Sequence, residues 1–369
     1  MSQSSREAEP PRQCVPRQSL GTRNCAVLAF LVIVTMSAAL ARAAEPPKVK
    51  VETVLSGLNN PTAVVFRPGT SELLISESGA GQVVRVLADK PGKPAPVITG
   101  FPVGPAPAPL GFQVGPLGIA FLDRVTFAVG SGGQGAGRDV VGIYTLPTGD
   151  KTLKFDDARR QLGPIKAGGD SKTGEGFFFG IAATPNAIFA TSHGDDSAGW
   201  VSRAFLIDNA GKAADLKPLI KTKVLAHTGG PMALIVSKRG ELVVGESGAL
   251  DKPHDSAISF YNPKDKGRLL LTVATGLNDI VGLAYSPRSG NLYALDLAWS
   301  DSKEAALYRI DATRQDGQMS AKAVKIAALE KPTALAFASD GTLYVTLFGD
   351  AAEGANEKTG QVVKITGDL

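Results

Sequence analysis

Three carboxylates recur at one position of a repeated pattern, and their side chains are suited to binding a cation. Glu77 and Glu246 stand in near-identical contexts, ISESGAG and VGESGAL, and Asp296 stands in the matching place of a third copy. Carboxylates that converge repel each other unless one takes up a proton or a cation binds. Oxygen ligands suit Ca²⁺ or another hard divalent ion. Two interpretations stay open: a metal site, or carboxylates that bind backbone amides and water.

Other side chains with useful chemistry follow in the segments after these positions. His193, Asp195 and Asp196 share the segment SHGDDSAG, which makes them candidates for a general base, although an exposed histidine in a turn is the simpler alternative. Both tryptophans of the chain also fall in such segments. The candidate ligand-binding residues are Arg138, Trp200, His254, Asp255, Trp299 and Asp301.

A repeated unit must position these residues. Six copies begin at residues 61, 116, 178, 231, 280 and 332, and each has a short apolar strand, a turn, a second strand, a loop and a third strand. The third residue of each first strand is small: Ala63, Gly118, Gly180, Ala233, Gly282 and Ala334. Short runs bounded by Gly, Pro and Asp are typical of strands and not of helical repeats. We therefore predict an all-β fold, a six-bladed β-propeller with four-stranded blades and small residues where the innermost strands converge.

The two ends of the repeated region indicate how the ring closes. The chain stops just after the third strand of the sixth copy, and the strand-like segment 49–55 precedes the first copy. We predict that this N-terminal segment completes the last blade as its outer strand, which leaves no exposed edge there. In that arrangement the carboxylates and the loops after them share one face around the central channel.

The repeats resemble those of a known group of propellers. The segments LSGLNNPTAVVFRPGTSELLISESGAGQVVRV and TGLNDIVGLAYSPRSGNLYALD are similar to NHL repeats, and the wider superfamily contains gluconolactonase-like lactonases, strictosidine-synthase-like proteins and soluble quinoprotein sugar dehydrogenases. The resemblance covers residues 48–369 and implies the six-bladed fold. In the metal-dependent lactonases a Glu, two Asn and an Asp surround the axis, whereas this chain has carboxylates but no Asn at the aligned positions.

The N-terminus has the parts of a secretory signal. An Arg-containing segment precedes the 15-residue apolar run 26–40, and Ala41-Arg42-Ala43 follows as a cleavage pattern. We predict a signal peptide over residues 1–43, cleavage near Ala43, a single propeller domain over 44–369, and a secreted or periplasmic location. Both cysteines lie in the removed part, so the mature chain has no disulfide and no Cys metal site.

Charge and hydropathy exclude two classes of partner. Without the first 43 residues the chain holds 34 basic and 33 acidic residues, which gives no electrostatic footprint for nucleic acid. No second apolar run approaches the length of a membrane span, so we expect no span in the mature chain.

These observations predict an exported binding module that holds a small molecule, glycan or peptide at the loop face around its channel. The first alternative is a metal-dependent hydrolase of lactonase or esterase type. In it a cation on Glu77, Glu246 and Asp296 would polarise an ester carbonyl, and His193 or a neighbouring Asp would act as base. The third reading is a quinone-dependent sugar dehydrogenase. Whether the protein is an enzyme stays open.

Overall fold

The computed structural model describes residues 48–369 except 107–111, 170, 196–197, 207–213, 224–227, 250, 316 and 350–357. The chain divides into two compact units, Met1–Ala44 and Glu45–Leu369. All described residues belong to the second unit. The predicted signal peptide lies outside the described residues and, like the exported location, stays a prediction.

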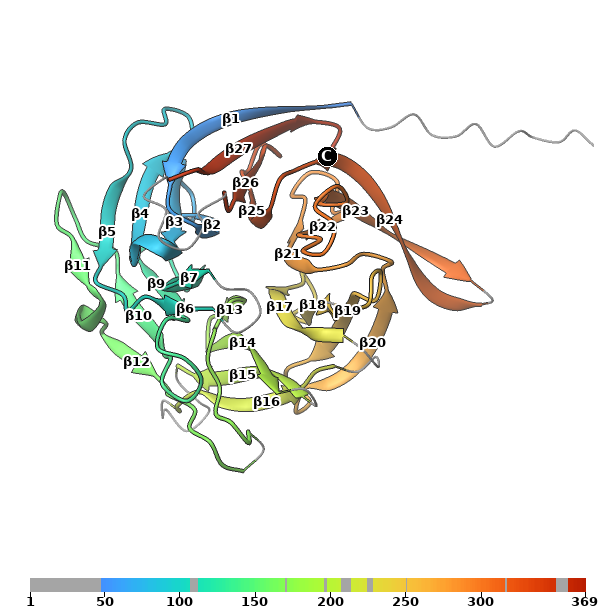
Figure 1. The fold of residues 1–369 in the computed structure, drawn as a ribbon, viewed down its shortest axis with the longest axis horizontal. Coiled ribbons are helices and arrows are strands. Elements are labelled where there is room, and N and C mark those ends of the chain that lie inside the picture. The colour runs from blue at the N-terminus through green and yellow to red at the C-terminus, as the bar shows by residue number, and fades with distance from the viewer. Residues whose placement is uncertain are drawn as a thin grey trace, which may run out of the picture. The chain divides into compact units, whose positions relative to one another are not determined.

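The second unit is a six-bladed β-propeller, as the six repeats predict (Figure 1). In each blade four strands pair antiparallel and follow one another outward from the axis. The innermost strands are β2 (Pro61–Phe66), β8 (Pro116–Phe121), β13 (Ile181–Thr184), β17 (Thr228–Val236), β21 (Ile280–Tyr285) and β25 (Pro332–Phe337). The second strands are β3 (Glu72–Glu77), β9 (Thr126–Ser131), β14 (Ala187–Asp195), β18 (Leu242–Gly248), β22 (Leu292–Asp296) and β26 (Leu343–Leu347).

The outer half of each blade follows the same order. The third strands are β4 (Gln82–Leu87), β10 (Val141–Thr145), β15 (Ala198–Phe205), β19 (Ala257–Asn262), β23 (Ala306–Gln315) and β27 (Gly360–Gly367). The outer strands are β5 (Ala95–Thr99), β12 (Arg160–Leu162), β16 (Lys217–Lys221), β20 (Arg268–Ala274), β24 (Gln318–Ala328) and β1 (Val49–Leu58). No helix among the residues described is both long and apolar enough to cross a membrane.

The N-terminal strand closes the ring. Strand β1 pairs antiparallel with β27, in a register that runs from Val49 opposite Gly367 to Leu58 opposite Gly360. The last blade therefore combines β1 with three strands from the C-terminal end of the chain (Figure 1). This confirms the predicted closure, and the strand extends three residues beyond the predicted segment 49–55.

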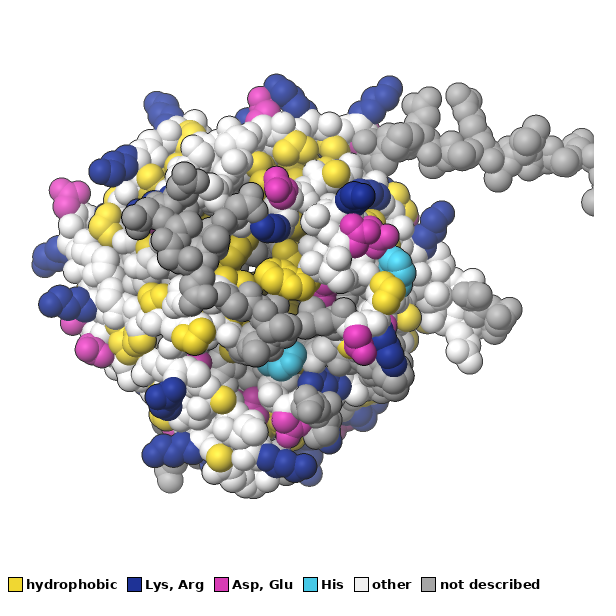
Figure 2. Space-filling view, in the orientation of Figure 1, with side chains coloured by type: hydrophobic (Ala, Val, Ile, Leu, Met, Phe, Trp, Pro, Cys, Tyr) yellow, Lys and Arg dark blue, Asp and Glu magenta, His cyan; other side chains and the backbone are white. Residues whose placement is uncertain are grey.

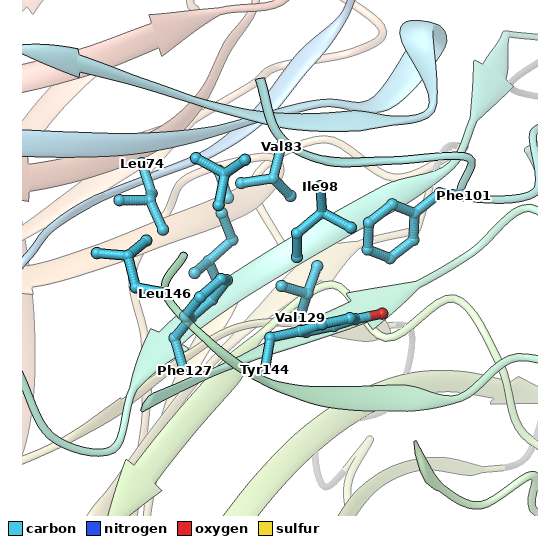
Figure 3. Packing of buried hydrophobic residues seen from close by; sticks show 11 residues of the cluster. Leu74, Val83, Ile98, Phe101, Phe127, Val129, Tyr144 and Leu146 are labelled. Carbon is cyan, nitrogen blue, oxygen red and sulfur yellow. The ribbon is translucent and has the colours of Figure 1, made fainter. Parts of the chain in front are cut away.

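Apolar side chains between neighbouring blades form the core. In the cluster between the first two blades, Leu74, Val83 and Ile98 of one blade face Phe127 and Tyr144 of the next (Figure 3). Each fully buried side chain of this size contributes ~1.5–3 kcal/mol relative to exposure. Short β11 (Leu153–Lys154), which follows β10 of the second blade, adds in parallel to β5 of the first and fastens the two blades together.

The neighbouring blade requires glycine as the third residue of two innermost strands. A Cβ atom on Gly118 would overlap the carbonyl oxygen of Phe179, and one on Gly180 would overlap that of Met232. These carbonyls belong to the next blade in each case. The predicted crowding is therefore confirmed, and its cause is the close approach of adjacent innermost strands.

Candidate functional site

Asp296 lies at the end of β22 and organises the backbone of its own blade. Its carboxylate accepts N–H groups from Asn278 at 2.9 Å, Asp279 at 2.7 Å and Ala298 at 3.0 Å. The side chain is only 1% exposed. It therefore joins the segment that enters β21 to the loop that leaves β22.

Glu77 and Glu246 have the same role in their blades. Glu77 accepts the Asn59 N–H at 2.9 Å and the Gln82 side-chain amide at 2.7 Å. Glu246 accepts the Lys223 N–H at 2.8 Å and the Ser259 hydroxyl at 3.1 Å. Each carboxylate binds the segment that precedes the innermost strand of its own blade.

The structure does not bring the three predicted metal ligands together as one ligand set. Within the described part of the chain, no group of three or more His, Cys, Asp or Glu side chains could hold a metal ion. The hydrogen bonds of Glu77, Glu246 and Asp296 to backbone amides match the alternative that the sequence left open. Binding of Ca²⁺ or another cation stays a prediction.

A ring of six side chains surrounds the axis one layer below these carboxylates. In five of the six blades a β-bulge interrupts the innermost pair of strands at the second residue of the repeat. The second residues are Thr62, Leu117, Phe179, Met232, Val281 and Thr333, and we call them the axial ring. The hydroxyls of Thr62 and Thr333 donate to the Pro116 and Pro61 carbonyls at 3.1 and 2.8 Å. The two threonine hydroxyls of the axial ring therefore form hydrogen bonds to the neighbouring blade.

An apolar cavity of about 60 Å³ lies on the axial ring at the loop face. Its rim brings together Phe112, Phe177, Trp299, Lys331 and Phe348, and we call it the mouth pocket. The ring centroid of Phe112 lies 5.7 Å from that of Trp299 and 4.8 Å from that of Phe348. Trp299 is 38% exposed. Figure 2 shows hydrophobic side chains near the centre of this face, with a few charged side chains beside them and most of the other charged side chains toward the periphery.

Phe112 reaches the axis on an inserted ribbon. Between the first two blades, β6 (Gly104–Pro105) pairs with β7 (Gln113–Val114), and the Ala106 N–H donates to the Phe112 carbonyl at 2.7 Å. The sequence analysis did not single out this segment. An aromatic residue inside a stretch rich in Gly and Pro was the available signal.

Asp279 holds the loop that presents Trp299. Its carboxylate accepts the Trp299 N–H at 2.8 Å, and the residue is only 8% exposed. Burial raises the pKa of Asp279 to about 6; the Trp299 N–H opposes the rise, and Asp296 and Asp255 add to it. The sequence analysis did not identify this residue either.

We expect Asp279→Asn to remove a pH dependence of stability. An acid with a higher pKa in the folded than in the unfolded state binds its proton more tightly when folded, so stability falls as pH rises from 3.8 to about 6. Asn keeps an acceptor for Trp299 without the buried charge. The variant should therefore be more stable at pH 7 by about 1–3 kcal/mol and no different at pH 3.5. Urea denaturation at both pH values measures this, and equal stability at pH 7 would contradict it.

Of the six predicted ligand-binding residues, Trp299 alone lines the mouth pocket. Trp200 is 9% exposed on β15, and Arg138 is exposed. His254 Nδ1 lies 3.1 Å from the Gly276 carbonyl and 3.7 Å from Glu304. Asp255 accepts the Ala249 N–H at 3.1 Å, and Asp301 accepts the Lys303 N–H at 3.1 Å, so both stabilise local turns.

The predicted catalytic residues occupy the third blade. His193 is exposed, and its ring packs close to Gly230, where a Cβ atom would lie 2.7 Å from Nδ1. The Asp195 carboxylate accepts the Ala198 N–H at 3.0 Å across the turn between β14 and β15. Asp196 lies outside the described residues. A base role for His193 or Asp195 stays a prediction.

Two further buried carboxylates were missed by the sequence analysis. Asp139 accepts N–H groups from Gln134 at 2.9 Å and Phe177 at 3.1 Å. Glu175 accepts the hydroxyls of Ser171 and Ser192. Burial raises the pKa of both carboxyls. They lie beside the position that carries Glu or Asp in other blades, so the alignment of repeats alone could not find them.

Comparison with known proteins supports the architecture. No protein-family model matches the sequence, and no curated protein matches it. A glucose dehydrogenase structure superposes with a TM-score of 0.57 at 16% identity, covering 86% of this chain and 100% of the other.

Two further structures agree. The soluble aldose sugar dehydrogenase of Escherichia coli in its apo form superposes with a TM-score of 0.55 at 16% identity. The superposition covers 87% of this chain and 100% of the other. A protein assigned as a gluconolactonase superposes with a TM-score of 0.51 at 13% identity. The superposition covers 88% of this chain and 93% of the other. At these identities the likeness shows the fold, and the chain shares the six-bladed β-propeller of these proteins.

Proposed function

We propose that this protein is a binding module that holds its ligand by an apolar group inserted into the mouth pocket. The main support is the exposure of Trp299. This large aromatic side chain is 38% exposed and lies in an aromatic rim at the axis. Small-molecule binding sites are largely pre-formed pockets with apolar walls, and aromatic side chains supply much of the area that contacts the ligand. Here loops of several blades bring Phe112, Trp299 and Phe348 together on a rigid ring of sheets.

The size of the mouth pocket limits the group it accepts. Its volume is about 60 Å³, well below the ~150 Å³ of an apolar cavity that binds benzene. It therefore takes a small aliphatic group of two or three carbons. Each methylene removed from water contributes about 0.8 kcal/mol. The remainder of a small molecule or peptide would lie across the loops that surround the mouth.

Hydrolysis and sugar oxidation remain alternatives, since the fold is shared with sugar dehydrogenases and a protein assigned as a gluconolactonase. For the hydrolase, Glu77, Glu246 and Asp296 would have to offer oxygen lone pairs to one cation. Those oxygens accept N–H groups of three separate blades. The apolar mouth therefore favours the binding module.

Trp299→Ala is expected to weaken the binding of 1-butanol by about five- to tenfold. The substitution removes one wall of the mouth pocket, so one or two methylene groups of the alcohol lose their burial, at about 0.8 kcal/mol each. Saturation-transfer NMR titration of the alcohol measures the change. Trp200→Phe is the matched control because Trp200 lies outside the pocket, and it should bind like the unaltered protein. Equal affinity of Trp299→Ala and the control would contradict the proposal.

A further inference from the structure

We propose that the outer edge of the fourth blade, at the end opposite the loop face, docks this protein onto an anionic lipid surface. At this edge a cluster of exposed Lys and Arg side chains adjoins two exposed leucines. The inference does not depend on the proposed function, because none of these residues lines the mouth pocket.

Two consecutive leucines are exposed on β20, the outermost strand of this blade (Figure 1). Leu269 is 39% and Leu270 is 40% exposed, and they are the only adjacent pair among the exposed large hydrophobic residues in the described part of the chain. The register of β20 against β19 shifts at this point and leaves Leu270 opposite no residue of β19. Such a bulge disrupts the regular alternation of side chains along a strand, and here both leucines reach solvent.

The turn that leads into β20 is basic. Lys264, Lys266 and Arg268 are exposed, and two N–H groups of the turn donate to the Asn262 carbonyl at 3.2 and 3.0 Å. The Asp265 carboxylate accepts the Arg268 Nε–H at 2.6 Å. Among the described residues no ion pair involves Lys264 or Lys266. Both lysine charges are therefore available to a partner beside the leucines.

Cations of two neighbouring segments extend this cluster. Because β18 pairs antiparallel with β19, the turn before β18 lies at the same end of the blade as the turn after β19. That turn exposes Lys238 and Arg239. In the third blade, Arg203 of β15 donates to the Pro263 carbonyl at 3.1 Å, and exposed Lys217 of β16 lies opposite Arg203. Cations of the third and fourth blades therefore gather at one edge.

This edge carries an excess of positive charge. Segments 215–217, 237–241 and 262–270, which we call the basic edge, hold six Lys and Arg against three carboxylates. Each carboxylate already accepts a hydrogen bond, Asp215 from the Gly163 N–H, Glu241 from the Ser237 hydroxyl and Asp265 from Arg268. The remainder of the chain after residue 43 has no excess of basic residues.

Charge and exposed apolar area together favour lipid as the partner. An anionic bilayer attracts each Lys or Arg near its surface, and apolar side chains beside them enter the headgroup region. A soluble polyanion would engage the cations but would leave the leucines in water. Docking at the basic edge also leaves the mouth pocket open to solution, because the turns on either side of β18 and β19 lie at the end of the blade opposite the loop after β18.

Vesicle co-sedimentation of residues 45–369 tests the proposal. This compact unit contains every described strand, and it omits the apolar run 26–40, which would partition into lipid by itself. The protein should bind vesicles of equimolar phosphatidylglycerol and phosphatidylcholine but not vesicles of phosphatidylcholine alone. Binding should weaken as NaCl is raised from about 0.05 to about 0.5 M, because salt screens exposed charges. Equal binding to both kinds of vesicle would overturn the proposal.

A pair of lysine variants tests where the protein binds. Lys264→Gln/Lys266→Gln should lower the vesicle partition coefficient about 25-fold, since each lysine near an anionic surface contributes about fivefold. Lys90→Gln/Lys93→Gln is the matched control, because both lysines are exposed in the turn after β4 of the first blade, across the ring (Figure 1). The control should bind within about twofold of the unaltered protein. Equal losses in the two variants would mean that overall charge, and not the basic edge, attracts the protein.

Leu270 distinguishes a lipid surface from a soluble polyanion. Leu270→Ser should lower the partition coefficient about three- to sevenfold, because the exposed part of the side chain no longer enters the bilayer. Leu87→Ser, at a leucine that is 49% exposed on β4, is the control and should bind like the unaltered protein. If Leu270→Ser also binds like the unaltered protein, the basic edge recognises polyanions in general and the lipid inference is wrong. Leu270→Trp gives an independent readout, since its fluorescence should shift to shorter wavelength with the anionic vesicles, and an unchanged spectrum would contradict insertion.

Discussion

Deleting residues 48–56 is expected to destabilise the propeller by about 5 kcal/mol or more and to make it aggregate. Strand β1 joins the N-terminal end of the chain to the last blade by strand pairing, with backbone partners from Val49–Gly367 to Leu58–Gly360. Its loss exposes the edge of β27 and the apolar cluster under Val54 and Leu55. Typical domains are stable by only 5–15 kcal/mol, so the effect approaches the whole stability. An unpaired strand edge also promotes association between chains.

Thermal unfolding and light scattering of the deletion variant measure both effects. A synthetic peptide of residues 48–58 added in trans should restore the melting temperature in a saturable way, because it can pair with β27. A scrambled peptide of the same composition is the control. An unchanged melting temperature and unchanged solubility of the deletion variant would show that the ring does not depend on this strand.

Asp296→Ala is expected to lower the free energy of unfolding by about 3–5 kcal/mol. The substitution leaves the N–H groups of Asn278, Asp279 and Ala298 without their acceptor at a site where all three residues are buried. Each unsatisfied buried donor costs about 1–3 kcal/mol. Relief of the repulsion between Asp296 and Asp279 offsets a part of this loss.

Urea denaturation at pH 7 measures the stability of Asp296→Ala. The control is Asp301→Ala. Asp301 lies five residues after Asp296, is exposed, and accepts the N–H of Lys303 in a local turn. The control should change stability by less than about 1 kcal/mol. A loss below that value for Asp296→Ala would mean that the carboxylate is not the structural acceptor inferred here, and would favour a cation-binding role instead.

Much of the fold could be predicted from the repeats. The six starts and the short apolar runs predicted six blades, and the segment 49–55 predicted the closing strand; both are confirmed. Local sequence suffices for most of the fold because five blades consist of strands that follow one another in the chain, and only the last blade combines β1 with strands from the C-terminal end. The small third residues were also informative, and at Gly118 and Gly180 their physical reason is a carbonyl of the next blade.

The candidate site could be predicted only in part. The alignment placed Glu77, Glu246 and Asp296 correctly at the ends of second strands, but it could not show whether their oxygens face the axis or their own blade. That direction depends on hydrogen bonds to the segments entering the innermost strands. Trp299 was predicted as a binding residue from its loop alone, and it does line the mouth pocket.

The sequence by itself determined the architecture of this protein, because strand period, turn residues and small residues act within one repeat or between successive ones. Only the tertiary structure decided what occupies the axis. Bulges interrupt the innermost strand pair beside the axial ring in five blades, and ring closure brings Phe112 into contact with Trp299 and with Phe348, which follow it by 187 and 236 residues. Such contacts between distant residues follow from the closed ring as a whole, and no local pattern specifies them.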